Sequence, residues 1–180
     1  NQIVEEHYNP IITTIRNIEK PVVAAVNGVA AGAGASIALC CDIVVACESA
    51  SFIQAFSKIG LIPDSGATFF LPRIIGMQRA TGLMMTAEPI SAKDAIKIGM
   101  IYKLFTDNTF ESESWKLVTK LASMPTKGLA LTKKLLNESY SNNLEEQLEK
   151  EKIYQTIAGK TNDYKEGTDA FLQKRKPNFK

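Results

Sequence analysis

Apolar runs separated by small-residue breaks divide the first part of the chain into short buried elements. Val22–Val26 is an apolar, mostly β-branched run that predicts a fully buried strand, and Ile43–Ala46 predicts a second one. Asn27-Gly28 breaks the first run, and Gly32-Ala33-Gly34 then leads into Ala35–Cys41, an apolar segment long enough for two helical turns. The order strand, small-residue loop, short helix and strand is typical of an α/β fold.

Helical patterns lie on both sides of this region. Residues 2–18 carry a broad apolar stripe, and Pro10 within it is expected to bend or restart the helix. Met77–Glu88 predicts an amphipathic helix, and residues 91–98 predict a shorter one that begins with a capping-box-like Ser91-x-x-Asp94. Met100–Phe105 then predicts a further strand.

From Asn108 onward the pattern is helical only. Four helices are predicted, at Phe110–Met124, Thr126–Tyr140, Asn143–Ala158 and Asn162–Lys174. The charged run in the third of them is interpreted as a solvated helix face with i,i+4 ion pairs.

Composition narrows the class of protein. The chain has 180 residues, of which 45% are hydrophobic and 22% charged, which is enough for one globular domain with a sizeable core. The net charge of +2 gives no argument for a nucleic acid or membrane partner. No apolar run is long enough to span a bilayer, and no signal peptide is recognisable. Cys40, Cys41 and Cys47 are interpreted as reduced core thiols of a cytoplasmic protein.

The junction at Gly32-Ala33-Gly34 is the first candidate site. A glycine-rich turn that opens a helix leaves outward-pointing N–H groups, which can hold a phosphate or a carbonyl oxygen that is becoming an oxyanion. A P-loop is excluded because Gly34 is followed by Ala35 and Ser36, with no Lys. A dinucleotide fingerprint fits poorly, since Ile37 occupies the third glycine position. Close strand–helix packing alone is the remaining structural alternative.

The second candidate site is Asp64, in Pro63-Asp64-Ser65-Gly66. Such a segment is ordinary turn chemistry, in which Asp bonds its own backbone. The functional interpretation is a carboxylate on a rigid turn with apolar neighbours in the sequence, a setting that suits proton transfer.

The two stretches together resemble the crotonase (enoyl-CoA hydratase/isomerase) superfamily over essentially the whole chain. VNGVAAGAGA, AFSKIGLIPDSG and LPR are most similar to the ring-1,2-epoxyphenylacetyl-CoA isomerases within it. The resemblance implies an α/β fold with a ββα spiral core and a C-terminal helical trimerisation region. It divides the chain into an incomplete catalytic core, 1–107, and a helical region that builds the oligomer and covers the active site, 108–180.

The resemblance also implies roles for individual residues. The N–H of Ala33, with Gly34 behind it, falls on one of two donors to the thioester oxygen, and Asp64 falls on the acid/base carboxylate of the isomerase branches. Ser36 and Phe56 occupy the positions of the two hydratase glutamates. One carboxylate suffices to move a double bond, whereas hydration also needs an activated water, so isomerase activity is favoured. Ser36→Ala is accordingly expected to change turnover little.

Further contacts follow from the same resemblance. Substrate or CoA contacts are expected at Ala31, Gly32, Ile62, Pro63, Phe171 and Lys174. Phe171 and Lys174 would reach the CoA of a neighbouring subunit in a homo-trimer or hexamer, although a frayed basic helix end explains this segment equally well.

The sequence thus predicts an acyl-CoA isomerase that converts ring-1,2-epoxyphenylacetyl-CoA to oxepin-CoA. Two alternatives remain: a Δ3,Δ2-enoyl-CoA or dienoyl-CoA isomerase, and a catalytically silent CoA-binding or assembly subunit. No metal or redox cofactor is expected, and CoA belongs to the substrate. Compared with the superfamily, about the first third of the catalytic fold is expected upstream of Asn1, including the second oxyanion donor.

Overall fold

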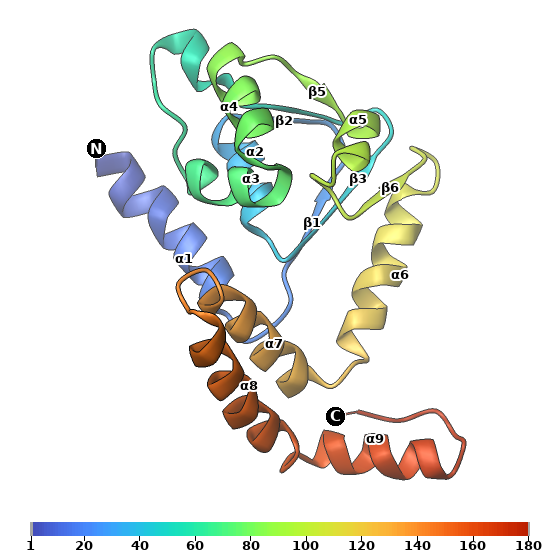
Figure 1. Cartoon of the computed structure of the whole chain (residues 1–180). Helices are drawn as coiled ribbons and strands as arrows, with labels where there is room; N and C mark the ends of the chain where they lie inside the picture. Colours follow the sequence, from blue (N-terminus) through green and yellow to red (C-terminus); the bar gives the residue numbers. More distant parts are fainter. Residues whose placement is uncertain (1, 180) are drawn as a thin grey trace. The chain divides into compact units, whose positions relative to one another are not determined.

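The computed structural model describes residues 2–179, which form two compact units (Figure 1). Unit 1 contains the residues up to Arg16 together with Val22–Lys116, and unit 2 contains Asn17–Pro21 and the residues from Leu117 onward. The boundary between Lys116 and Leu117 falls inside the helix Phe110–Ala122. The functional division between residues 107 and 108 stays a prediction, because compactness alone does not test it.

The strands of unit 1 form two small sheets. The first contains three parallel strands: β1 (Val23–Val26), β3 (Ile43–Cys47) and β6 (Lys103–Phe105). The second contains β2 (Val29–Ala31), β4 (Ser51–Ile53) and β5 (Ile90–Ser91), with β2 and β4 parallel and β5 antiparallel to β4. The strands expected at Val22–Val26, Ile43–Ala46 and Met100–Phe105 are confirmed within three residues at each end.

The two sheets arise from a repeated ββα pattern. Strands β1 and β2 lead into helix α2, and β3 and β4 lead through a 3₁₀ helix into helix α3. Because β3 pairs with β1 and β4 pairs with β2, each repeat adds one strand to each sheet. The chain therefore winds as a spiral, and both helices pack against each other inside unit 1.

The helices of unit 1 account for most of its remaining residues. They are α1 (Asn9–Asn17, whose last residue belongs to unit 2), α2 (Ala33–Cys40), α3 (Ala67–Ile75), α4 (Met77–Thr86) and α5 (Ala92–Lys97), with a π-helical turn at Val4–Tyr8 and the 3₁₀ helix at Ala55–Ile59. Their apolar faces meet the sheets in one core, in which Leu39 of α2, Phe52 of β4 and Leu71 of α3 are almost fully buried.

Helix α6 (Phe110–Ala122) crosses the boundary between the units, and unit 2 then contains α7 (Thr126–Glu138), α8 (Leu144–Ala158) and α9 (Asn162–Leu172). These are the four helices that the sequence predicts. Asn143 and Glu146 form a full capping box at the start of α8, with Asn143 Oδ1 accepting from Glu146 N–H at 2.9 Å and Glu146 Oε2 accepting from Asn143 N–H at 2.9 Å. Within residues 2–179, no helix is both long and apolar enough to cross a membrane.

Pro10 does not interrupt the first helix. Helical residues continue from Gln2 to Asn17, and the chain passes through a π-helical turn immediately before Pro10. In this turn the N–H of Asn9 donates to the carbonyl of Val4, five residues earlier. A π turn changes the local hydrogen-bond spacing, which accommodates the N–H that proline lacks.

Four elements near the candidate site differ from the expectation. Val29–Ala31 is a strand where a small-residue loop is expected, and α2 begins at Ala33 instead of Ala35. Ser51–Ile53 is a further strand, and the segment after Asp64 becomes helix α3 despite Pro72. Short strands of three residues carry too little periodicity to be recognised, and pairing with a neighbouring strand decides them.

Candidate active site

Gly32 connects β2 to α2 and fixes the first candidate site in place. Its N–H donates to the carbonyl of Ile53, at the end of β4, at 2.8 Å. Its backbone has φ 54° and ψ −123°, a combination open essentially to glycine alone. Phe56 lies on its far side, because a Cβ built on Gly32 would meet the Phe56 ring at 3.8 Å. The start of α2 is therefore held by a neighbouring strand and by a buried aromatic ring.

The N–H groups at the start of α2 face the site without a partner in the described chain. Within residues 2–179, the N–H groups of Ala33 and Gly34 make no hydrogen bond, as expected for the first turn of a helix. The next N–H that is used belongs to Ser36 and donates to the Gly32 carbonyl at 3.1 Å. Two aligned donors at the positive end of a helix can stabilise an oxygen that gains negative charge.

Asp64 lies on a tight turn that leads into α3. The turn is closed by Ala67 N–H, which donates to the Asp64 carbonyl at 3.0 Å. Both central residues have positive φ, 53° at Ser65 and 76° at Gly66. The Ser65 hydroxyl, itself almost fully buried, donates to Asp64 Oδ1 at 2.9 Å. The carboxylate is thus oriented by the residue that follows it.

The surroundings of Asp64 are apolar but more open than the sequence suggests. The carboxylate is half-buried, and Phe70 is buried beneath the turn. Ile62, in contrast, is 82% exposed, and Ile59 and Leu61 also face outward. Isolated exposed apolar residues are common on proteins, but several in one loop indicate a surface that another molecule covers.

Gly66 shows how tightly the acidic turn packs. A Cβ at this position would lie 2.9 Å from Phe70 Cε2 and 3.6 Å from Ile12 Cγ2 of the first helix. Arg16, one turn later in α1, lies over the Phe70 ring at 5.5 Å and bonds Asp42 at 3.1 Å. Helix α1 therefore holds Phe70, and with it the start of α3.

Phe56 links the two turns. Its ring lies beside Gly32, 3.8 Å from where a Cβ of that residue would stand, and its carbonyl accepts from Leu61 N–H at 3.0 Å, three residues before Asp64. The structure thus connects Ala33 and Asp64 through one buried side chain and one short loop. The other expected contacts in unit 1 lie beside these two residues: Ala31 and Gly32 precede Ala33, and Ile62 and Pro63 precede Asp64.

Phe171 and Lys174 lie in unit 2, at and just after the end of α9. Phe171 is 82% exposed, and Lys174 has a φ of 52° with its N–H donating to the Phe171 carbonyl at 3.2 Å. Their expected contact with a neighbouring subunit's CoA stays a prediction.

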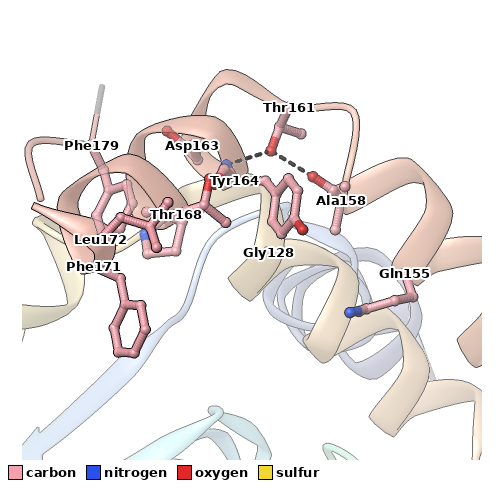
Figure 2. A pocket seen from close by; sticks show the side chains of 13 residues that line it. Gly128, Gln155, Ala158, Thr161, Asp163, Tyr164, Thr168, Phe171, Leu172 and Phe179 are labelled. Atoms are coloured by element: carbon pink, nitrogen blue, oxygen red, sulfur yellow. Dashed lines mark hydrogen bonds between the residues drawn. The ribbon is translucent and has the colours of Figure 1, made fainter.

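A pocket of about 480 Å³ lies within unit 2, between α7, α8 and α9 (Figure 2). Thr161 holds its upper edge, with its hydroxyl donating to the Ala158 carbonyl at 2.7 Å and accepting from Tyr164 N–H at 3.2 Å. Phe171 and Leu172 also line it, whereas the residues around Ala33 and Asp64 do not. The lining therefore includes one residue that is expected to contact CoA, Phe171.

The cysteines take no visible part in the site. Cys40, Cys41 and Cys47 are reduced thiols, and the first and last of them are buried. A hydrogen bond with Cys41, together with burial, raises the pKa of the Cys40 thiol, which keeps it protonated and unreactive. Within residues 2–179, no cluster of His, Cys, Asp and Glu is arranged to hold a metal ion. The expectation that no cofactor is needed stays a prediction.

Three of these features are not predicted from the sequence: the position of the Phe56 ring beside Gly32, the bond from Ser65 to Asp64, and the bond from the Ser36 hydroxyl to the Gly32 carbonyl. A serine four residues after a glycine at a helix start is a usable signal for the last of them, since helix residues i and i+4 lie one above the other.

Comparison with known proteins identifies relatives over the whole chain. Residues 1–180 match the family described as Enoyl-CoA hydratase/isomerase. The chain is 48% identical to the 1,2-epoxyphenylacetyl-CoA isomerase of Escherichia coli K12, over 98% of this chain and 67% of that protein. It is 44% identical to a protein of Rhodobacter capsulatus named "Probable enoyl-CoA hydratase", over 98% of this chain and 69% of the other. It spans about two thirds of each relative.

Comparison with a solved structure supports the same family and shows its fold. The crystal structure of an enoyl-CoA hydratase from Polaromonas sp. JS666 superposes with a TM-score of 0.93 at 38% identity, covering 98% of this chain and 68% of that one. The ββα spiral and the C-terminal helices are therefore those that the sequence resemblance predicts.

Proposed function

Since the chain belongs to the enoyl-CoA hydratase/isomerase family and has the crotonase fold, we propose that the protein is an acyl-CoA isomerase that uses Asp64 as its acid/base group. The family makes an acyl-CoA thioester the expected substrate class. The relatives include both isomerases and hydratases, so the site itself must decide between the two activities.

The observation that carries the isomerase proposal is the residue set around the start of α2. By the family resemblance, Ser36 and Phe56 correspond to the hydratase glutamates, and both are buried side chains without a carboxylate. Asp64 is the carboxylate on the turn linked to Gly32 through Phe56. A site with one carboxylate can move a proton between two carbons but lacks the second group that activates and positions a water.

In the proposed reaction, the N–H of Ala33 donates to the thioester oxygen. This contact stabilises the enolate that forms when a neighbouring C–H loses its proton, because negative charge develops on that oxygen. Asp64 takes the proton and returns it at another carbon, so that the double bond moves and the carboxylate is regenerated. No metal or redox cofactor has a role in this scheme, and CoA belongs to the substrate.

The specific substrate that we propose is ring-1,2-epoxyphenylacetyl-CoA, converted to oxepin-CoA. The support is the 48% identity to the E. coli enzyme, together with the sequence motifs around Gly32 and Asp64. The shift of a Δ3 double bond to Δ2 in an aliphatic or dienoyl chain is the alternative, because it uses the same proton transfer. Comparing kcat/KM on ring and aliphatic substrates separates the two.

We also propose a homo-trimer or hexamer in the cytoplasm, with the C-terminal helices forming the contacts between subunits. Exposed apolar residues on unit 2, Phe171 and Leu172 among them, support the assembly. A silent CoA-binding subunit is the competing function, and binding of acyl-CoA without any turnover by the full natural polypeptide would establish it.

Asp64→Asn in the full natural polypeptide tests the proposed chemistry. Asn suits the turn and changes little volume, so fold and acyl-CoA binding are expected to persist. Isomerase kcat is expected to fall by roughly 10²–10⁴, the contribution of one general acid/base group. Exchange of solvent deuterium into the product should fall in parallel.

Asp94→Asn is the matched control, because Asp94 is an exposed carboxylate at the start of α5. Its isomerase rate should equal that of the wild type. Full activity in Asp64→Asn would show that another group moves the proton.

A further inference from the structure

Ser36 is a fully buried residue in the first turn of α2, and both of its donors point to the same oxygen. Its hydroxyl donates to the Gly32 carbonyl at 3.1 Å, and its backbone N–H donates to that carbonyl at 3.1 Å. The Ser36 side chain has no exposed surface, so no water is available to replace the hydroxyl.

The oxygen that Ser36 holds belongs to the peptide group between Gly32 and Ala33. This is the group whose N–H, that of Ala33, points at the thioester oxygen in the proposed function. A peptide group is planar, so fixing its carbonyl oxygen also fixes the direction of its N–H. Donation to the carbonyl polarises the amide and strengthens the N–H as a donor on the opposite side, because hydrogen bonds in a chain are cooperative.

Other contacts restrain the N-terminal side of Gly32 and leave its carbonyl to the Ser36 donors. Gly32 N–H is tied to Ile53 at 2.8 Å, and the Phe56 ring lies against Gly32. These contacts hold the N-terminal side of Gly32, whereas the two Ser36 donors hold its carbonyl side. The Ser36 hydroxyl is therefore the side-chain contact on the carbonyl of the peptide group that carries the Ala33 N–H.

Hydrogen bonds from a side-chain hydroxyl to the carbonyl four residues earlier are common in helices. Two other such bonds in this chain show how Ser36 differs. Thr86 donates to Gly82 O at 2.9 Å, and Thr132 donates to Gly128 O at 2.9 Å. Both threonines are exposed. Water can replace such bonds, and neither lies at a helix start beside the candidate site. Ser36 differs in its burial and in the peptide that it holds.

We propose that Ser36 is a positioning residue of the acyl-CoA site: it orients and polarises the Gly32–Ala33 peptide so that the Ala33 N–H stabilises the enolate oxygen. This inference rests on the proposed function. It replaces the expectation from sequence that Ser36→Ala changes turnover little, since the hydroxyl supports the peptide group that carries the Ala33 N–H.

The test measures polarisation of a bound thioester together with turnover in the full natural polypeptide. Cinnamoyl-CoA is a suitable probe, because its conjugated thioester absorbs further to the red when the carbonyl oxygen accepts strong hydrogen bonds. We expect Ser36→Ala to bind the probe with a smaller red shift than wild type. Isomerase kcat should fall roughly 10-fold, less than the roughly 10²–10³ typical for outright loss of an oxyanion donor, with little change in KM.

Two further variants serve as controls for Ser36→Ala. Ser36→Cys keeps the shape of the side chain but is somewhat larger and donates more weakly, so its red shift and kcat should lie between those of Ser36→Ala and wild type. Ser114→Ala removes another buried serine hydroxyl, one that has no hydrogen-bond partner in the described chain, and should behave as wild type.

The outcomes separate this inference from the function on which it rests. A wild-type protein that neither shifts the probe nor isomerises an acyl-CoA contradicts the proposed function itself. A wild type that does both, beside a Ser36→Ala protein with the same shift and the same kcat, contradicts the role of Ser36. Lower stability with an unchanged shift would likewise assign Ser36 a structural role only. If Ser36→Ala does not fold, wild-type values in Ser36→Cys overturn the inference.

Discussion

Two backbone positions in this site have unusual conformations. Gly32 has a φ of 54° and a ψ of −123°, and Ser65 has a φ of 53° although it carries a side chain. Each unusual conformation lies next to a residue of the proposed chemistry: Gly32 precedes Ala33, and Ser65 follows Asp64. Strained backbone of this kind persists only where surrounding contacts hold it, and it clusters at functional sites.

Gly32→Ala tests this at the residue scale. The new methyl group would meet the Phe56 ring at 3.8 Å, an ordinary contact, so the cost comes from the backbone conformation. We expect a loss of roughly 1–3 kcal/mol in the free energy of unfolding. We also expect a fall in isomerase kcat, because relaxation of this backbone turns the Ala33 N–H away. Denaturant unfolding and a steady-state assay measure the two effects.

Gly82→Ala is the matched control. Gly82 lies within α4, and a Cβ there meets nothing within 4 Å. This variant should be stabilised by up to about 1 kcal/mol, the helix propensity difference, with normal activity. Equal stability of wild type and Gly32→Ala would show that the turn is not strained.

At the scale of elements, helix ends are where this chain places its specific polar contacts. Asn143 and Glu146 cap the start of α8, and Thr161 caps the start of α9. After the end of α9, Arg175 binds Glu166 through both carboxylate oxygens, at 2.6 and 2.9 Å, and the N–H of Asn178 donates to Glu166 at 2.7 Å. One carboxylate thus ties the C-terminal segment back to its helix.

The attachment of this segment should depend on pH. The hydrogen bonds from Arg175, and then the N–H of Asn178, lower the pKa of Glu166 from 4.5 to about 2. Because the folded-state pKa is depressed, the attachment is complete above about pH 4.5 and is lost as the pH falls through about 2. The Asn178 amide resonance in NMR spectra should follow this transition.

Glu166→Gln should release the segment at neutral pH while α9 stays helical, whereas Glu151→Gln, on an exposed face of α8, should leave it attached. An Asn178 amide that is insensitive to both the pH and the Glu166 substitution would show that other contacts hold the segment.

At the scale of the molecule, unit 2 exposes several large apolar side chains. Its exposed apolar side chains include Phe171 at 82%, Leu172 at 77% and Leu144 at 73%. Phe171 and Leu172 also line the pocket between α7, α8 and α9 (Figure 2). Exposed apolar patches of this kind mark sites of association.

We therefore expect a native mass of three or six chains for the full natural polypeptide, measured by light scattering at micromolar concentration. Leu172→Asp places a charge on the apolar surface and should shift the mass toward a single chain. A monomeric wild type would contradict the proposed assembly, and with it the proposed role of Lys174 at a neighbour's CoA.

The sequence by itself determined the parts of the protein that depend on local pattern. The buried strands at β1 and β3 and the four C-terminal helices follow from runs and periodicity, since burial and helix repeat leave their mark on consecutive residues. The positions of Ala33 and Asp64 followed from motifs, because a glycine-rich helix start and an acidic turn each consist of consecutive residues.

Only the tertiary structure decided what depends on contacts between distant segments. Strands β2 and β4 are three residues each and exist because they pair with each other, Ala31 beside Ile53. Helix α3 forms over Pro72 because its apolar face packs into the core. The contact of Phe56 with Gly32 joins residues 24 positions apart, so no local pattern records it. Burial likewise made Ser36 a support of the Ala33 N–H, because a hydroxyl that water cannot replace acts only through its protein partner.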